Sequence, residues 1–213
     1  MTGTAHEPVV VVHGLWVSGL VMELARRRIA RAGFAARSFS YRSVRGTLSE
    51  NADALVRFLG GLRAHLLGHS LGGLVILQAL ARHPGLATGR VVLVATPYGG
   101  SVSGARLARI PGGGPLLGRS MREWLDQPRP AEFGSREIGV IAGTVGVGLG
   151  RLCGARFAGP HDGVVGLDET AVPGMRDRVV LPLNHTGMAF APAVTRQACA
   201  FFRNGRFDRD GAV

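Results

Sequence analysis

The run Gly68-His69-Ser70-Leu71-Gly72-Gly73 restricts the local fold more tightly than any other stretch of this sequence. It follows a short apolar run, Leu66-Leu67, and precedes a helical pattern over 74–80. A chain that turns sharply from a strand into a helix strains the residue at the turn and admits only small neighbours beside it. The run therefore predicts a strand–turn–helix unit with Ser70 at the turn, where the helix N-terminus favours negative charge.

The pattern G-x-S-x-G is weak support when it stands alone, because glycine is abundant here. The chain holds 33 glycines and ten serines among 213 residues. At this composition about 0.25 matches to the pattern are expected by chance in a chain of this length. The surrounding elements and the residues downstream must therefore carry the interpretation.

Short β-branched runs alternate with helical patterns along the chain. Strands are expected at Val9–Val12, Ala35–Tyr41, His65–Gly68, Val91–Ala95, Ile138–Ala142 and Arg178–Leu183. Helices are expected at Leu20–Ala32, Leu48–Leu62, Leu71–Arg82 and Met188–Arg203. This alternation predicts one α/β domain over 1–213, in three layers, with a mostly parallel six-stranded sheet covered by helices on both faces.

Residues 97–135 interrupt this alternation. They contain no strand pattern, three consecutive glycines (112–114) between prolines, and one short amphipathic piece around Leu116–Leu125. Loops of this length in a compact domain are usually functional or mobile, so we expect a lid or substrate-binding cap over the site. The alternative is a disordered surface excursion.

The formal charge is +11, and all 25 basic residues are arginines. The lack of lysine excludes a Schiff-base lysine, a Ser-Lys dyad and the lysine of a phosphate-binding loop. No basic stripe is interleaved with aromatic residues, so nucleic-acid binding is not expected. The arginines form either a solvated surface or one that attracts anionic substrates or membranes.

Cys153 and Cys199 lack metal-ligand spacing and are expected to be free thiols in a reducing compartment, with a disulfide as the alternative. The first apolar run, Val9–Val12, is too short for a signal peptide, which predicts a cytoplasmic protein unless the sequence is trimmed. No stretch approaches 18 apolar residues, so no membrane span is expected.

A serine nucleophile needs a base, and the base needs an orienting acid. In the α/β-hydrolase arrangement the order along the chain is serine, acid, histidine. Only His161 and His185 lie well past Ser70, and the acid is expected in the loop after the strand Ile138–Ala142, where every available acid follows His161. His185 alone satisfies the order. The candidate acids are Asp162, Asp168, Glu169 and Asp177.

Asp162 is the favoured acid, because the Asp162-Gly163 pair predicts a tight turn that can aim a carboxylate. If Asp162 is only a turn residue, Asp168 is the next candidate.

Acyl transfer also needs N–H donors for the developing oxyanion. The backbone N–H of Leu71, directly after the serine, and that of Leu15, after the first strand, are the expected pair. Trp16 is expected either in the acyl pocket or as a core aromatic, and His69 and Tyr98 are further pocket candidates. His13 is expected to have a structural hydrogen-bonding role.

Together these segments resemble the α/β-hydrolase superfamily, in particular small bacterial lipases and carboxylesterases. The resemblance covers most of the chain, and it implies a minimal fold that starts at the family's usual third strand. The matching segments are His13-Gly14-Leu15-Trp16, Gly68–Gly73, Thr96-Pro97-Tyr98-Gly99-Gly100-Ser101, Asp162-Gly163-Val164-Val165 and His185-Thr186-Gly187.

The resemblance implies that Ser70 attacks an ester carbonyl, His185 moves the proton and Asp162 holds the imidazole. It implies no cofactor and no metal. The expected partner is a small acyl ester, with contact to a lipid surface also allowed. The alternatives are a thioesterase, an amidase or an acyltransferase with the same three residues, or a non-catalytic protein that binds an acyl ligand.

Overall fold

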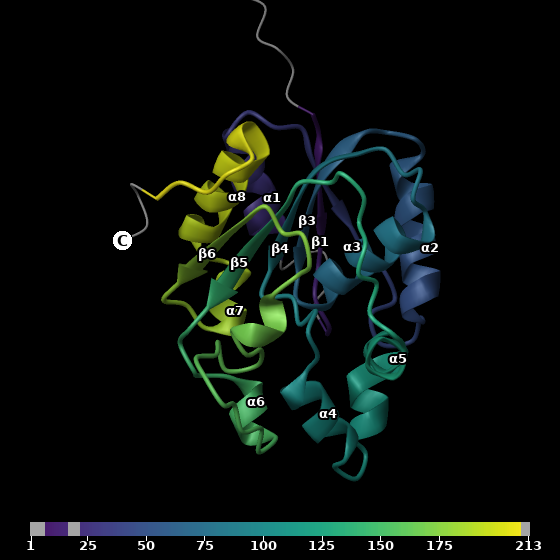
Figure 1. The fold of residues 1–213 in the computed structure, drawn as a ribbon, viewed down its shortest axis with the longest axis vertical. Coiled ribbons are helices and arrows are strands. Elements are labelled where there is room, and N and C mark those ends of the chain that lie inside the picture. The colour runs from purple at the N-terminus through teal and green to yellow at the C-terminus, as the bar shows by residue number, and fades with distance from the viewer. Residues whose placement is uncertain (1–6, 17–21, 210–213) are drawn as a thin grey trace, which may run out of the picture.

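The computed structural model describes residues 7–16 and 22–209, which form a parallel sheet with helices on both faces (Figure 1). The sheet has six strands in the order β2-β1-β3-β4-β5-β6. This confirms the expected α/β class and the six-stranded sheet. The strands are β1 (Val9–Val12), β2 (Ala36–Phe39), β3 (Ala64–His69), β4 (Thr88–Val94), β5 (Ile138–Gly143) and β6 (Asp177–Leu181).

Strand β1 shows why the sheet needs cover on both faces. All four of its valines are buried, and successive side chains point to opposite faces. Val10 and Val12 pack in the core beneath α2 (Leu48–Leu59) and α3 (Leu71–Arg82). Val9 and Val11 pack in the other core, beneath α1 (Glu23–Arg31) and α8 (Pro192–Asn204).

Helix α2 begins at the capping box that its sequence predicts. The Thr47 hydroxyl accepts a hydrogen bond from the Glu50 N–H, and the Glu50 carboxylate accepts one from the Thr47 N–H. The helix ends at Leu59 rather than at the expected Leu62, because Gly60 adopts a left-handed conformation with φ of 57°.

Two other expected helices differ in their bounds. Of the expected helix Leu20–Ala32, residues 20 and 21 lie outside the described part of the chain, and α1 starts at Glu23. The expected helix Met188–Arg203 is wrong as one element, since α7 (His185–Met188) and α8 are separate. The backbone of Ala191 is extended, and Pro192 then starts α8 at a position where its missing N–H costs nothing.

The segment 97–135 contains two helices, α4 (Val102–Ala108) and α5 (Gly113–Asp126). Helix α5 includes the amphipathic piece expected around Leu116–Leu125, whereas α4 was not expected. Ser101 caps α4 by accepting a hydrogen bond from the Gly104 N–H. Helix α5 is broken at Gly118, whose φ is 78°. A Cβ there would meet the Val44 Cα at 2.8 Å, so glycine is needed for this close packing.

The second half of α5 is anchored in the core. The Trp124 side chain is fully buried there. The Glu123 carboxylate accepts hydrogen bonds from the Leu48 N–H and the Ser49 hydroxyl at the start of α2. Helices α4 and α6 (Leu149–Leu152) lie at the end of the molecule toward which the strands run (Figure 1).

Within the described residues, no helix combines the length and apolar character needed to cross a bilayer. Cys153 and Cys199 are free thiols, as the sequence predicts, and Cys199 is buried on α8.

Candidate active site

Ser70 occupies the sharp turn between β3 and α3. Its φ of 54° and ψ of −124° are strained for a residue with a side chain. Its neighbours cannot be larger, because a Cβ on Gly68 would meet the Gly73 Cα at 2.6 Å. A Cβ on Gly72 would collide with the Val12 carbonyl oxygen of β1. The turn thus projects the Ser70 side chain from the carboxyl end of the central strands.

Three side chains from distant parts of the chain meet at this point. The Ser70 Oγ lies 3.0 Å from Nε2 of His185, which begins α7 just after the last strand. The His185 Nδ1 lies 2.7 Å from Oδ2 of Asp162. This arrangement can transfer a proton from the serine to the imidazole while the carboxylate stabilises the resulting cation.

The Asp162 carboxylate is buried and fixed by its own turn. Its Oδ1 accepts hydrogen bonds from the N–H groups of Val164 (2.9 Å) and Val165 (2.7 Å). Its Oδ2 is thereby left to face His185. Asp168, the next candidate, begins a short 3-10 helix (Asp168–Thr170). Within the described residues, Asp162 is the only one of the four candidate acids whose carboxylate is hydrogen-bonded to the His185 ring.

The backbone of His185 is held on both sides. Its N–H donates to the Asp162 carbonyl at 2.8 Å. Its carbonyl accepts a hydrogen bond from Nε2 of His69 at 3.1 Å. His185 is therefore positioned by His69, the residue before the serine, as well as by Asp162. The contact with His69 was not predictable from the sequence.

His69 is neutral in this environment. Burial, with a smaller effect of the neighbouring His185, lowers the pKa of His69 to about 3. Because its Nε2 donates to a carbonyl, the proton lies on Nε2, and the buried Nδ1 has no partner within the described chain.

The loop after β1 faces Ser70 from the other side. A Cβ on Gly14 would meet the Ser70 Cβ at 3.2 Å, so glycine allows this close approach. Within the described residues, the N–H groups of Leu15 and Leu71 have no hydrogen-bond acceptor, and both residues line the same cavity as Ser70. Both remain candidates for the oxyanion donors.

His13 has the structural position that its sequence context predicts. Its Nδ1 donates to the Gly14 carbonyl at 2.8 Å, and its Nε2 accepts a hydrogen bond from the Tyr41 N–H at 3.3 Å. Its ring stacks on Tyr41. Burial lowers the pKa of His13, which keeps the ring neutral and able to accept this hydrogen bond.

A cavity of about 310 Å³ opens beside Ser70. No charged residue lines it, and its walls come mainly from the loop after β1 and from α3, α4, α5, α6 and α7. The apolar wall residues are Leu15, Trp16, Leu71, Pro97, Leu107, Leu117, Met121, Leu149, Val164, Val165, Ala189 and Phe190. Such a cavity suits an uncharged, apolar group.

Two of the candidate pocket residues, Trp16 and His69, lie in this wall. Trp16 is half exposed and donates from Nε1 to the Leu116 carbonyl of α5, so it is not a core aromatic. Tyr98 corrects the expectation, because it lies outside the cavity wall. Its ring packs on Trp124, and its hydroxyl donates to the Pro130 carbonyl at 2.8 Å.

Glu169 is a functional candidate whose contacts the sequence did not predict. Its carboxylate accepts hydrogen bonds from the Gly166 N–H (2.7 Å), in the loop after Asp162, and from the Val102 N–H (2.6 Å), in the first turn of α4. Burial raises the pKa of Glu169. No local sequence signal could predict the contact with Val102, because 67 residues separate it from Glu169.

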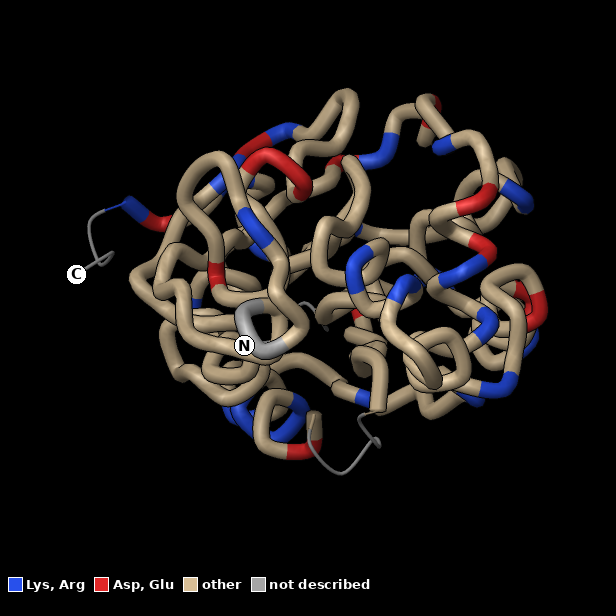
Figure 2. Tube along the Cα trace, turned by 90° about the horizontal axis from the view of Figure 1, so that it is seen from below, with Lys and Arg blue, Asp and Glu red and all other residues tan. Residues whose placement is uncertain are grey.

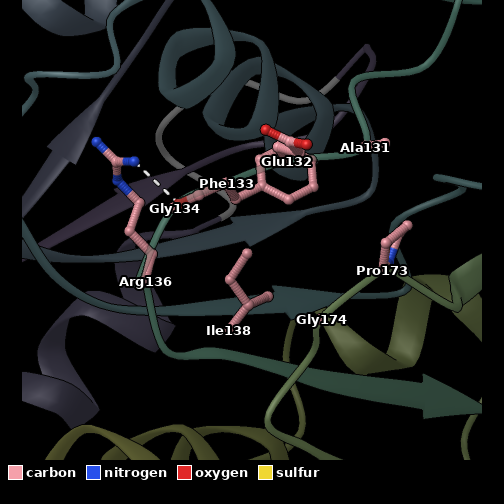
Figure 3. Close-up of a pocket in the computed structure, with 8 residues that line it drawn as sticks. All are labelled: Ala131, Glu132, Phe133, Gly134, Arg136, Ile138, Pro173 and Gly174. Atoms are coloured by element: carbon pink, nitrogen blue, oxygen red, sulfur yellow. Dashed lines mark hydrogen bonds between the residues drawn. The ribbon is translucent and has the colours of Figure 1, made fainter.

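A second hollow, of about 340 Å³, lies next to Ile138 at the start of β5, away from Ser70 (Figure 3). Its wall contains no serine, histidine or cysteine, and Arg136 is engaged with the Phe133 carbonyl. Among the described residues, no group of three or more histidine, cysteine, aspartate or glutamate side chains could hold a metal.

The sequence matches one known protein family over most of its length. The sequence model of the family described as "Alpha/beta hydrolase family" matches residues 9–209. The chain belongs to the alpha/beta hydrolase family. A search of the curated proteins finds no match.

Solved structures resemble this alpha/beta hydrolase over most of its length. The mature lipase of Bacillus licheniformis has a TM-score of 0.71 and 18% identity, over 96% of this chain and 94% of the lipase. The chain spans 48% of the propeptide form of that lipase. A Bacillus subtilis carboxylesterase has a TM-score of 0.58 and 17% identity, over 95% and 85% of the two chains.

A thioesterase of prodiginine biosynthesis from Streptomyces coelicolor has a TM-score of 0.59 and 16% identity, over 95% of this chain and 92% of the thioesterase. At these identities the three structures support the shared fold. What this hydrolase acts on must be inferred from its own site.

Proposed function

We propose that this alpha/beta hydrolase cleaves carboxylic esters with uncharged, apolar acyl groups through an acyl-enzyme on Ser70. The observation that carries the proposal is the continuous hydrogen-bonded series from the Ser70 Oγ through His185 to Asp162, at 3.0 and 2.7 Å. This series opens into a cavity without charged residues.

The chemistry follows from these positions. The Ser70 Oγ attacks the ester carbonyl while the His185 Nε2 takes the hydroxyl proton, and the negative oxygen forms beside the N–H groups of Leu15 and Leu71. When the tetrahedral intermediate collapses, His185 passes its proton to the leaving alkoxide. A water molecule, deprotonated by His185, then attacks the acyl-enzyme, and the proton returns to Ser70 as the carboxylic acid leaves.

We further propose that residues 97–135 act as the cap over this site. Leu107 of α4 and Leu117 and Met121 of α5 contribute to the cavity wall, so these helices define the space for the acyl chain. The partner is a small acyl ester. A cytoplasmic location stays a prediction from the sequence.

Replacement of the nucleophile tests the proposal. Ser70→Ala should reduce kcat for p-nitrophenyl acyl esters by at least about 10⁴-fold, because no other hydroxyl among the described residues is hydrogen-bonded to the His185 Nε2. Turnover would be measured by release of p-nitrophenol over a series of acyl lengths. Undiminished turnover by the purified variant would overturn the proposal. Thioester and amide analogues of the same acyl groups separate ester hydrolysis from the alternative reactions.

The assignment of the acid has a matched control. Asp162→Asn should lower kcat by about 10⁴-fold, because an amide at Oδ2 favours the wrong imidazole tautomer. Asp168→Asn, six residues along the chain and without a hydrogen bond to the His185 ring within the described residues, should retain most of the activity. The reverse ranking of the two variants would contradict the role of Asp162.

A further inference from the structure

Exposed apolar side chains gather around the mouth of the cavity. Trp16, Leu149 and Phe190 belong to the cavity wall and are nevertheless 50, 51 and 38% exposed. Leu116, 57% exposed, lies beside Trp16 through the hydrogen bond of the indole to its carbonyl. Val147, 63% exposed, precedes Leu149 by two residues. These five side chains form what we call the mouth patch.

Three of the five side chains, Leu116, Val147 and Leu149, lie on segments that are basic and contain no acidic residue. These segments, residues 97–122 and 144–161, include six arginines and no aspartate or glutamate. Arg106, Arg109, Arg119, Arg122 and Arg156 are exposed, and none of the five forms an ion pair within the described chain. Figure 2 looks onto this end of the molecule and shows basic segments spread across it.

An exposed apolar patch surrounded by unpaired cations is complementary to the interface of an anionic bilayer. The interface of a bilayer offers hydrocarbon to the apolar side chains, and its anionic headgroups pair with arginines. A second copy of this chain would bring like charges together at the same patch, which disfavours that occupant.

We propose that the mouth patch docks this hydrolase onto an anionic lipid surface, with the cavity mouth facing the lipid. The relevance of docking to substrate delivery rests on the proposed function, because the cavity would then receive an apolar ester without passage through water. The docking itself depends only on the patch and the arginines around it.

Vesicle binding tests the docking separately from catalysis. The Ser70→Ala protein, which leaves the lipid intact, would be mixed with phosphatidylcholine vesicles or with vesicles that contain about 30% phosphatidylglycerol. We expect sedimentation with the anionic vesicles to exceed that with the neutral ones by about tenfold at low salt, and to fall as salt is raised.

Variants of the patch and matched controls locate the contact. Leu116→Glu with Val147→Glu, or Arg106→Gln with Arg109→Gln, should each reduce anionic vesicle binding by about tenfold, while turnover of a soluble short ester by the Ser70 form is retained. Leu62→Glu and Arg206→Gln change an exposed leucine and an exposed arginine near the starts of β3 and β5, at the opposite end, and should change neither quantity.

Equal binding to both kinds of vesicle, or equal losses in the patch and control variants, would overturn the proposal. So would a change of oligomeric state in the patch variants without any change in vesicle binding, since that result would assign the patch to a second copy. Far-UV circular dichroism of each variant establishes that it is folded.

Discussion

His185 is held in place by more than its side chain. The His69 Nε2–H holds its carbonyl, and the Asp162 carbonyl holds its N–H. Loss of the first contact would leave a buried carbonyl without a donor and let the imidazole drift from Ser70. Displacements of about 1 Å in an active site can cost about 100-fold in rate.

Substitution of His69 tests this positioning role. His69→Leu should lower kcat by about 10- to 100-fold with little change in KM, because the imidazole moves while the cavity keeps its size. His69→Gln places an amide N–H at the same number of bonds from Cβ and should recover most of kcat. If His69 had only a structural role, the two variants would differ in stability but would keep the same kcat.

At the residue scale, chain order was enough to propose Ser70, Asp162 and His185, because only His185 follows an acid that lies after the fifth expected strand, Ile138–Ala142. The sequence could not reveal the contact of His69 with His185, since 116 residues separate them. The expectation that Tyr98 lines the cavity was wrong for a similar reason. Its neighbour Trp124 belongs to a helix whose packing no local pattern specifies.

At the scale of elements, the turn between β3 and α3 requires α3 to start close to the end of β1. Gly72 lies against the carbonyl oxygens of Val12 and His13, which leave no room for a methyl group. The glycine pair after Ser70 is therefore as much a packing requirement as a conformational one.

Gly72→Ala should destabilise the fold by about 1–3 kcal/mol, because α3 must move away from β1 to admit the methyl group. Gly85→Ala is the matched control, since a Cβ there has no neighbour within 4 Å and should have little effect on stability. Urea unfolding measures both. An unchanged midpoint for Gly72→Ala would contradict the tight packing.

The bounds of elements were predictable where a local chemical signal marks them. The Thr47 capping box gives the start of α2, and the six strands lie within a few residues of the apolar runs. The bend of α5 was not predictable, because Gly118 packs against Val44, which lies far away in the sequence. Ser101 at the start of α4 is a local cap like Thr47, but no apolar helical pattern accompanies it.

At the scale of the whole molecule, three buried histidines link stability to pH. Burial lowers the pKa values of His13, His65 and His69 in the folded state. Below about pH 6.5 the unfolded chain therefore binds more protons than the folded one. The free energy of unfolding consequently decreases as the pH is lowered. The raised pKa of Glu169 has the opposite sign and offsets part of this loss.

His69→Gln isolates one contribution. With a folded pKa of about 3, His69 should remove about 2 kcal/mol of stability between pH 7 and pH 5. The variant should therefore lose about that much less than the unmodified protein over the same interval. Urea unfolding at the two pH values gives both differences. Equal losses of stability in the two proteins would contradict a lowered pKa of His69 in the folded state.

The carboxylate of Glu169 has a mechanical consequence. It ties the first turn of α4 to the loop that follows Asp162, so α4 cannot swing outward without breaking one of the two hydrogen bonds. If the proposed ester enters beneath α4, the position of this helix and that of Asp162 beside His185 are therefore linked. A ligand that displaces α4 would also disturb the loop that holds Asp162, whereas one that fits beneath the helix would leave Asp162 in place.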